Sequence, residues 1–185
     1  MIDYGILANS IKFYGTQGFK ELDVPWIVSR RASDITTPSF VTATSAVCNS
    51  IDYEDPVLVG SAEQSFLQMR LDGNLPDGKY QATSPCFRDE SDETHFPYFM
   101  KNELIWISSQ KLTVEQCYRV VLEPAFDFMR RIRGSSVYIE KTDKGCDIMI
   151  GSLELGSYGV RYHKDIGYWI YGTGVALPRI SMILP

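Results

Sequence analysis

The order of apolar and polar positions predicts a chain that begins with a helix and continues in extended structure. Residues 2–15 carry apolar side chains at helical spacing, and Gly15 and Gly18 close the segment. The apolar run 19–28, which contains a proline, predicts extended backbone. Residues 33–50 are rich in Ser, Thr and Ala and predict loop mixed with short strand.

The middle of the chain combines a short strand, a helix and two longer strands. Val57–Val59 predicts the short strand, and Ser61 begins the helix. Two longer strand patterns, 79–88 and 96–107, are separated by the polar, acidic residues 89–94, which predict a turn between them.

A second long helix has a marked beginning. Thr113 and Gln116 form a capping box, so we expect a helix from there toward Arg133, kinked or split at Pro124. Four short strand patterns follow it, at 137–140, 147–150, 153–155 and 168–171.

The end of the chain completes the predicted architecture. Residues 172–176 contain two glycines and predict a turn, and residues 177–184 predict a final short helix. Strand-rich segments with helices at both ends predict an α+β fold, with an antiparallel β-sheet flanked by helices. At 185 residues, the chain is expected to form a single domain, 1–185.

Composition narrows the class of protein. A formal charge of −5 speaks against a protein that grips a long stretch of nucleic acid, because phosphate neutralisation requires a basic surface. No apolar run approaches the length of a membrane span, and the first residues do not read as a signal peptide. Cysteines without a CxxC pair predict reduced thiols. We therefore expect a cytoplasmic protein without a membrane or DNA partner.

The first candidate site combines an arginine, a carboxylate and an aromatic ring on two neighbouring strands. Arg88 and Glu90 lie where one predicted strand ends, and Phe99 lies near the start of the next, so these side chains are expected to converge. Arginine suits a phosphate, a carboxylate suits an adenine amino group, and an aromatic face suits the base. A salt-bridged hairpin without a ligand would contain the same residues.

Two further candidate sites rest on isolated charges. Arg179 lies in an otherwise apolar tail and must reach solvent or meet an anion. Asp147 and Glu154 lie on either side of a Gly-Ser turn between two predicted strands, and this pair of carboxylates suits a hard divalent cation. The simpler alternative is that both carboxylates form salt bridges.

These segments, in this order, resemble the three signature motifs of class II aminoacyl-tRNA synthetases. Segment 18–25, with Gly18-Phe19 and Val24-Pro25, is similar to motif 1, which builds the family's dimer interface. Segment 87–99 is similar to motif 2, and segment 172–179 is similar to motif 3. The resemblance implies the family's sheet flanked by helices, an ATP-dependent ligase activity and a two-fold homodimer.

Within the class, the chain looks most like the aspartyl- and asparaginyl-tRNA synthetases. Stretch 147–163 has an Asp and a Glu seven residues apart, an Arg seven residues further on, and an Arg-x-His end. His95, Phe99 and Glu103 follow one another at intervals of four, which is also asparaginyl-like. Segment 60–67 is similar to the one whose glutamine holds the amino acid.

The resemblance implies a role for each of these residues. Arg88 and Arg179 would be catalytic, and Arg88 would bridge the α-phosphate and the attacking carboxylate. The implied ATP-binding residues are Arg88, Glu90, His95, Phe99, Glu154 and Arg179. The implied cofactors are ATP and Mg²⁺.

The amino acid and the metal would be held by a second group of residues. The implied amino-acid-binding residues are Gln64, Glu103 and Arg161, with Asp34 as a further contributor to the α-amino end. Arg161 would read a side-chain oxygen of the substrate, because its planar fork suits a carboxylate. The implied Mg²⁺ ligands are Asp147 and Glu154.

The chain also departs from the family pattern. Pro178 stands where a glutamate is usual before the motif 3 arginine, and Ala176 stands where a glycine is usual. The sequence ends six residues after Arg179, and it contains neither a large insertion between motifs 2 and 3 nor an OB-fold that reads an anticodon. We therefore expect a catalytic core without an anticodon-binding domain.

Three functions are compatible with this pattern. The first is activation of aspartate or asparagine to an aminoacyl-adenylate that is passed to an acceptor other than an anticodon-read tRNA, as in an asparagine synthetase or an amino-acid ligase. The second is a minimal aspartyl- or asparaginyl-tRNA synthetase. The third is a non-catalytic paralogue with a regulatory or binding role.

Overall fold

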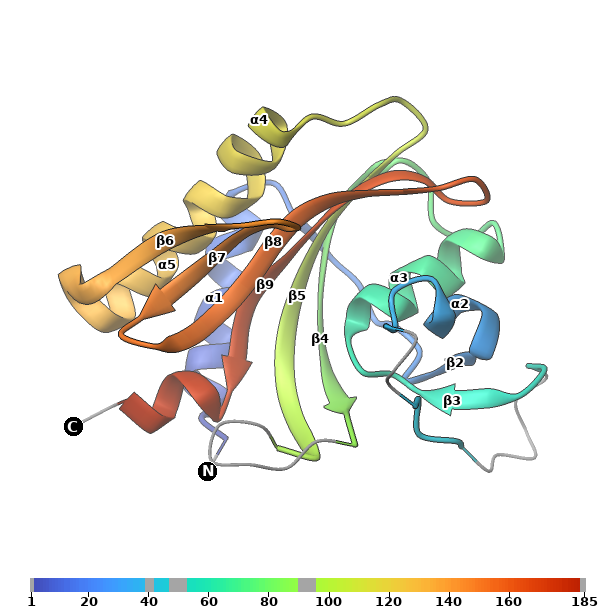
Figure 1. Ribbon diagram of the computed structural model, residues 1–185, viewed down its shortest axis with the longest axis horizontal. Coiled ribbons are helices and arrows are strands. Elements are labelled where there is room, and N and C mark those ends of the chain that lie inside the picture. Colours follow the sequence, from blue (N-terminus) through green and yellow to red (C-terminus); the bar gives the residue numbers. More distant parts are fainter. Residues whose placement is uncertain (1, 39–41, 47–52, 90–95, 184–185) are drawn as a thin grey trace.

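A seven-stranded sheet with the strand order β1-β4-β5-β9-β8-β7-β6 forms the centre of the computed structural model, which describes residues 2–38, 42–46, 53–89 and 96–183 (Figure 1). All of its pairs are antiparallel except β1 with β4. Its strands are β1 (Lys20–Glu21), β4 (Gly78–Phe87), β5 (Tyr98–Ser108), β6 (Val137–Thr142), β7 (Gly145–Ile150), β8 (Leu153–His163) and β9 (Gly167–Leu177). The predicted α+β class with an antiparallel sheet is confirmed.

Helices and a small second sheet cover this central sheet. The small sheet pairs β2 (Ile27–Ser29) with β3 (Pro56–Leu58). The α-helices are α1 (Tyr4–Thr16), α2 (Arg30–Asp34), α3 (Ala62–Leu71), α4 (Val114–Cys117) and α5 (Glu123–Arg133). One π-helical turn (Tyr118–Leu122) and two 3₁₀ turns (Gly134–Ser136 and Arg179–Ile183) complete the elements.

The predicted helix beginnings are confirmed, because each depends on a local hydrogen bond. The Ser61 hydroxyl caps α3 by accepting from the backbone N–H of Glu63. Thr113 and Gln116 form both bonds of the capping box at the start of α4. The helix is split as expected, since α5 begins next to Pro124, which has no N–H to donate to the preceding turn.

The C-terminal third contains longer strands than the sequence predicts. The expected short strands at 153–155 and 168–171 are parts of the long strands β8 and β9. The expected turn at 172–176 is wrong, because these residues continue β9. Their glycines serve close packing: a Cβ on Gly172 would lie 2.6 Å from both the Tyr158 ring and the Val121 side chain. The expected final helix is reduced to the 3₁₀ turn.

The N-terminal part of the chain differs from the prediction at one place, the end of α2. The run 19–28 is extended, as predicted, and contains β1 and β2. The start of the segment 33–50 is not loop but the end of α2, which Ser29 caps. Ser45 forms an isolated bridge with Val57, in line with the expected short strand, whereas residues 39–41 and 47–50 lie outside the described residues.

Two apolar layers lie on opposite faces of the large sheet. Consecutive residues of β5 and of β9 enter different layers, because side chains alternate across a strand. Leu104 and Ile170 pack with α1 and α5, whereas Ile105 and Trp169 pack with α3. Figure 1 shows α1 and α5 on one side of the sheet, and α2, α3 and the small sheet on the other.

A β-bulge in β9 changes which of its residues face the α3 side. The register shifts between Asn102 and Glu103, so Gly174 is the extra residue of β9. As a result, Thr173 and Ala176 line cavities on the same face although they are three positions apart. A Cβ on Gly174 would lie only 2.9 Å from the Asn102 carbonyl oxygen, which explains the glycine.

A second bulge has the same effect in β8. The register shifts between Ile148 and Met149, so Leu155 is the extra residue and packs into the helix-side core. Glu154 and Ser157 therefore both face the α3 side. Bulges re-aim side chains next to functional sites, and these two lie on neighbouring strands of the sheet.

The described residues contain neither a membrane-spanning helix nor a disulfide bond. None of their helices is long and apolar enough to cross a membrane. Cys86, Cys117 and Cys146 are free thiols, as the sequence predicts, and burial raises the pKa of Cys86 to about 11 and that of Cys117 to about 12. Cys48 lies outside the described residues.

We predict that Gly174→Ala destabilises the fold by about 2 kcal/mol, because the added methyl group enters a filled site. Besides the Asn102 carbonyl, it would meet the Tyr14 ring at 2.9 Å, and the Tyr14 hydroxyl already donates to the Gly174 carbonyl oxygen at 2.8 Å. Urea unfolding followed by circular dichroism measures the change in free energy of unfolding.

Gly15→Ala is the matched control for this substitution. A Cβ on Gly15 would find its nearest neighbour, the Gln81 amide nitrogen, at 3.9 Å, and alanine is the better helix former in α1. We expect unchanged or slightly higher stability. Equal stability of the two variants would contradict the packing argument.

Candidate active site

The α3 face of the large sheet contains two neighbouring cavities that form one cleft. The larger cavity has a volume of about 380 Å³ and lies between α2, α3 and the strands β8 and β9. The smaller one, about 50 Å³, lies at the ends of β4, β5 and β9. Arg88, Lys101, Glu154 and Thr173 line both cavities, so the two spaces meet at these side chains.

One wall of the larger cavity is held in place by Gln64. Its side-chain oxygen accepts from the backbone N–H of Gly60 at 2.7 Å. Its amide nitrogen donates to the hydroxyls of Ser33 at 3.2 Å and Thr37 at 3.0 Å. Gln64 therefore ties the end of α2 to α3 and lines the cavity, but its amide is already engaged within the protein. The amino-acid-binding role that the resemblance implies stays a prediction.

A buried ion pair joins α3 to the sheet at the floor of the larger cavity. The Nη1 of Arg161 donates to both carboxylate oxygens of Glu63, at 2.8 and 2.9 Å, and the indole Nε1 of Trp169 donates to the same carboxylate at 2.6 Å. The Arg161 guanidinium also lies 4.0 Å from the centre of the Tyr171 ring. Burial raises the pKa of Glu63, and the Arg161 charge partly offsets that effect.

A second ion pair lies on β5. The Lys101 ammonium contacts the Glu103 carboxylate at 2.6 Å, and the Ser61 hydroxyl donates to the same carboxylate. Because Glu103 is 1% exposed, it is a buried carboxylate that requires these two partners. Lys101 lines both cavities where they join. Glu103 is buried beneath this junction and interacts with it through its ion pair with Lys101. The direct substrate contact implied for Glu103 stays a prediction.

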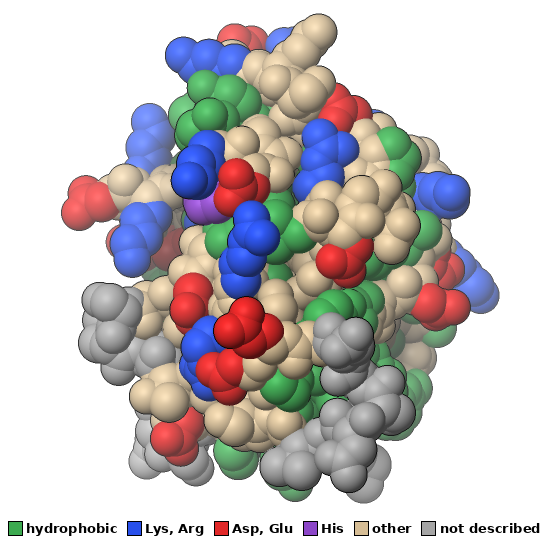
Figure 2. All heavy atoms as spheres, turned by 90° about the vertical axis from the view of Figure 1, so that its right-hand side faces the viewer, with side chains coloured by type: hydrophobic (Ala, Val, Ile, Leu, Met, Phe, Trp, Pro, Cys, Tyr) green, Lys and Arg blue, Asp and Glu red, His purple; other side chains and the backbone are tan. Residues whose placement is uncertain are grey.

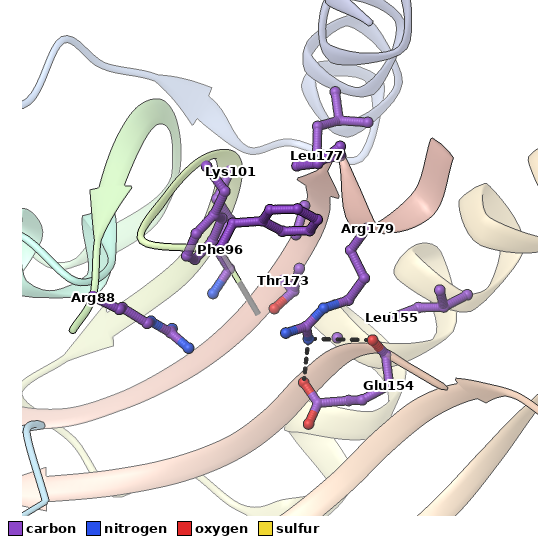
Figure 3. A pocket seen from close by; sticks show the side chains of 12 residues that line it. Arg88, Phe96, Lys101, Glu154, Leu155, Thr173, Leu177 and Arg179 are labelled. Carbon is purple, nitrogen blue, oxygen red and sulfur yellow. Dashed lines mark hydrogen bonds and ion pairs between the residues drawn. The ribbon is translucent and has the colours of Figure 1, made fainter. Parts of the chain in front are cut away.

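The smaller cavity contains the arginines expected at the nucleotide. Figure 3 shows Arg88 and Arg179 reaching into it from opposite sides, with Phe96 and Thr173 between them in this view. The Arg88 guanidinium lies 5.1 Å from the centre of the Phe99 ring, and its Nε donates to the Gly60 carbonyl oxygen at 3.2 Å. Phe99 lines this cavity as well.

Arg179 contacts an anion, which is one of the two outcomes that the sequence analysis left open. Its Nη1 lies 3.6 Å from a carboxylate oxygen of Glu154 and donates to the Glu154 backbone carbonyl at 3.3 Å. Both residues line the smaller cavity (Figure 3). The Glu154 side chain remains about half exposed, so it can still accept from or coordinate a ligand in the cleft.

The carboxylates expected to bind Mg²⁺ lie on neighbouring strands. Asp147 pairs across the sheet with Ser157, which lines the larger cavity, so Asp147 lies on the cleft face. Its Oδ1 is buried and has no hydrogen-bond partner among the described residues, which is compatible with a cation ligand. No cluster of three or more His, Cys, Asp or Glu occurs in the described part of the chain. Two carboxylates fit Mg²⁺ if phosphate oxygens and water complete its shell.

Besides Glu103 and Asp147, which line neither cavity, three expected site residues do not lie in the described cleft. Glu90 and His95 lie outside the described residues. Asp34 is the last residue of α2 and is exposed, in contrast to its neighbour Ser33, which is buried and lines the larger cavity. Of these two neighbours, only Ser33 forms part of the cavity wall.

The structure also adds residues that the sequence did not single out. They are Glu63, Lys101, Phe96 and Tyr171, all of which line one or both cavities. A glutamate in the first turn of a helix is ordinary, since it complements the helix dipole, so Glu63 gave no signal of its own. The one indication in the sequence that Glu63 lies in the site was its position next to Gln64, within segment 60–67, which the resemblance assigns to amino-acid binding.

The surface around the cleft carries mixed charge. Figure 2 shows Lys and Arg side chains interspersed with Asp and Glu on the face that α2, α3 and the small sheet present. On the described part of this face there is no continuous basic area. The mixed charge agrees with the net charge of −5.

Comparisons with solved structures identify the fold. The chain is similar to two structures of the pyrrolysyl-tRNA synthetase from Desulfitobacterium hafniense, with TM-scores of 0.72 and 0.74 at 19% and 18% identity. It is also similar to the cytoplasmic serine-tRNA ligase from Naegleria fowleri in complex with AMP, with a TM-score of 0.70 at 15% identity. The chain therefore has the fold of class II aminoacyl-tRNA synthetases, as the motifs imply.

These likenesses extend over nearly all of this chain but over only part of each solved chain. They cover 97%, 97% and 94% of this chain, but only 66%, 68% and 46% of the respective solved chains. The chain thus spans about two thirds of the pyrrolysyl enzyme and less than half of the seryl enzyme. No protein-family profile and no curated protein matches the sequence. The aspartyl/asparaginyl subclass is not among these likenesses.

We predict that Arg161→Met destabilises the protein by about 3 kcal/mol at neutral pH, because it leaves the Glu63 carboxylate buried without its cation. Burial holds the pKa of Glu63 above its unfolded value, so the cost of ionising it is absent at low pH and grows as the pH rises through the folded-state pKa. Without Arg161 that pKa rises further. Urea unfolding should therefore show a smaller loss at about pH 5 than at about pH 7.5.

Arg119→Met is the matched control. Arg119 forms an exposed pair with Glu115 one helical turn away, with exposed fractions of 66% and 76% for the two side chains. We expect a change of less than about 0.5 kcal/mol at either pH. An Arg161→Met effect that is independent of pH would show that Glu63 does not carry the buried charge.

Proposed function

We propose that this protein is an ATP- and Mg²⁺-dependent ligase that activates a small amino acid of the aspartate and asparagine class to an aminoacyl-adenylate. The observation that carries the proposal is the junction of the two cavities at Arg88, Lys101, Glu154 and Thr173. A nucleotide that lies against the walls of the smaller cavity, which at about 50 Å³ would enclose only a part of it, and an amino acid in the larger cavity would present their reacting groups to these side chains. The class II fold and the motif resemblance support the same assignment.

The chemistry requires cations at this junction. A carboxylate oxygen of the amino acid forms a bond to the α-phosphorus of ATP, while the bond from that phosphorus to the pyrophosphate oxygen breaks. Two anions approach each other, so catalysis depends on charge neutralisation and alignment. Arg88 would bridge the α-phosphate and the attacking carboxylate, and Lys101, which is paired with Glu103, would donate hydrogen bonds beside it.

The remaining nucleotide contacts follow the resemblance. Arg179 would lie against one face of the adenine and Phe99 against the other, since both side chains line the smaller cavity. Glu90 would accept from the adenine amino group, and His95 would contact the terminal phosphates. These roles are proposals for each of the four residues.

Asp147 and Glu154 are the proposed Mg²⁺ ligands. Both lie on the cleft face, and Glu154 lines both cavities. When bound, the cation would neutralise phosphate charge and so assist departure of pyrophosphate. Glu154 would then serve two purposes, because its ion pair with Arg179 also orients that arginine.

The acceptor of the activated amino acid stays a prediction. An acceptor other than an anticodon-read tRNA is our first proposal, and a minimal tRNA synthetase is the alternative. The pyrrolysyl and seryl enzymes that share the fold are tRNA ligases, and this likeness supports the alternative of a minimal tRNA synthetase. Incubation with bulk tRNA, ATP and labelled amino acid decides between them by the presence or absence of charged tRNA.

We predict ATP–pyrophosphate exchange that depends on an amino acid, and its loss by at least about 100-fold in Arg88→Ala, because the bridging charge is removed. The exchange is measured with labelled pyrophosphate and each of the twenty amino acids in turn. The fold of the variant is checked by circular dichroism, since Arg88 donates only one hydrogen bond to the Gly60 carbonyl among the described residues.

Arg119→Ala, on the exposed face of the π-helical turn, is the control and should exchange as the wild type does. Exchange at the wild-type rate in Arg88→Ala would refute the nucleotide-site assignment. Exchange with none of the amino acids would refute activation altogether and leave the non-catalytic paralogue.

We also predict a two-fold homodimer through segment 18–25 and its surroundings. Within this chain Phe19 and Val28 are buried, whereas Trp26 is 56% exposed and is available to a partner. Sedimentation velocity at a concentration on the order of micromolar should show a dimer, and Trp26→Asp should shift it to monomer by placing a charge in the contact. Tyr138→Asp, at an exposed position of β6, should leave the dimer intact. A wild-type monomer would contradict the prediction.

A further inference from the structure

The strongest unexplained feature of the cleft is the acidic partner of Arg161. The resemblance expects this arginine to read a side-chain oxygen of the substrate. In the structure the arginine already holds a carboxylate of the protein, because its Nη1 donates to both oxygens of Glu63 at 2.8 and 2.9 Å. Both residues line the larger cavity, so a substrate side chain that reaches Arg161 also reaches Glu63.

We infer that the larger cavity selects an amino acid whose side chain ends in a carboxamide rather than a carboxylate, and that Glu63 is the residue that excludes the carboxylate. This inference rests on the proposed function and names the substrate class of that same site. It adds a specificity-determining residue that the motif resemblance does not contain.

The first support is the balance of charge around the cavity. Three ion pairs surround the cleft, and each joins one cation to one carboxylate: Glu63 with Arg161, Glu103 with Lys101, and Glu154 with Arg179. A substrate carboxylate beside Arg161 would lose its hydration and meet a cation that Glu63 has already neutralised. Removing a carboxylate from water without a compensating charge is costly.

The second support is the pattern of donors and acceptors. A carboxamide has one oxygen that accepts and one NH₂ that donates, whereas an ionised carboxylate only accepts. Among the described residues, Nε and Nη2 of Arg161 make no hydrogen bond, so they remain as donors for an amide oxygen. The Glu63 carboxylate, which keeps accepting capacity beyond its bonds from Arg161 and Trp169, is the matching acceptor for the NH₂ group.

The third support is that the pair is held rigidly. Trp169 fixes Glu63 from below with its indole N–H, and the Tyr171 ring lies under the Arg161 guanidinium. Glu63 is 6% exposed, so it cannot swing out into solvent to make room for an acidic substrate. A site that is built to hydrogen-bond one side chain rejects an isostere that leaves those groups unpaired.

The test compares asparagine with aspartate in the full 185-residue chain. We expect the wild type to show a kcat/KM for ATP–pyrophosphate exchange at least about 10-fold higher with asparagine than with aspartate. In Glu63→Gln the new amide can still accept from Arg161 and Trp169, while its NH₂ can donate to a substrate carboxylate. We therefore expect the asparagine-to-aspartate ratio to fall by at least about 10-fold in this variant.

Glu115→Gln makes the same chemical change on the exposed surface of α4 and should keep the wild-type ratio. If Glu63→Gln fails to fold, calorimetric titration of the wild type with asparagine and with aspartate, in the presence of a non-hydrolysable ATP analogue, gives the ratio directly. Equal or better use of aspartate by the wild type, or an unchanged ratio in a folded Glu63→Gln, overturns the inference while amino-acid activation stands. Exchange that requires an amino acid without a side-chain carboxamide overturns it as well. Absence of exchange and of binding with every amino acid overturns the proposed function, and this inference with it.

Discussion

Buried charge compensation on the cleft face of the sheet is the constraint on which the rest of the structure depends. Glu63 and Glu103 are almost fully buried, and a buried carboxylate is tolerated only with a cation and hydrogen-bond donors around it. The partners come from different elements: Arg161 from β8, Trp169 from β9, and Ser61 from the cap of α3. Meeting these requirements positions α3 against the sheet and forms the cleft between them.

The sheet supplies the side chains in the correct directions because two of its strands are irregular. A regular strand would place Thr173 and Ala176 on opposite faces, and likewise Glu154 and Ser157. The extra residues Gly174 and Leu155 bring each pair onto the cleft face. The same bulges leave Leu155 in the apolar core packed against α1 and α5, so one irregularity serves both stability and the site.

The two ends of the cleft differ in how their charges are balanced. The proposed reacting end needs a net positive charge, which Arg88 provides where the cavities join, since Lys101 is paired with Glu103. At the far end of the larger cavity the Arg161 cation is balanced by the Glu63 carboxylate. In the inference above, this balance selects the side chain of the bound amino acid. Solved proteins at 15% to 19% identity share the fold that carries this cleft.

The sequence by itself determined the features that depend on neighbouring residues. The beginnings of α3 and α4, the division of the helix at Pro124 and the antiparallel pairing of β4 with β5 all follow from local caps, a missing N–H and alternating apolar positions. The order of the three motif-like segments was enough to indicate the class II fold, and six of the residues singled out on that basis line the two cavities: Gln64, Arg88, Phe99, Glu154, Arg161 and Arg179.

Only the tertiary structure decided which of these side chains interact. Glu63 and Arg161 are 98 positions apart, and nothing local distinguishes Glu63 from any glutamate in a first helical turn. The glycines of β9 suggest a turn when read alone, because their purpose is to admit Tyr158 and Val121 from other elements. Local patterns record the conformation of a segment, whereas charge pairing and close packing depend on what the fold brings next to it.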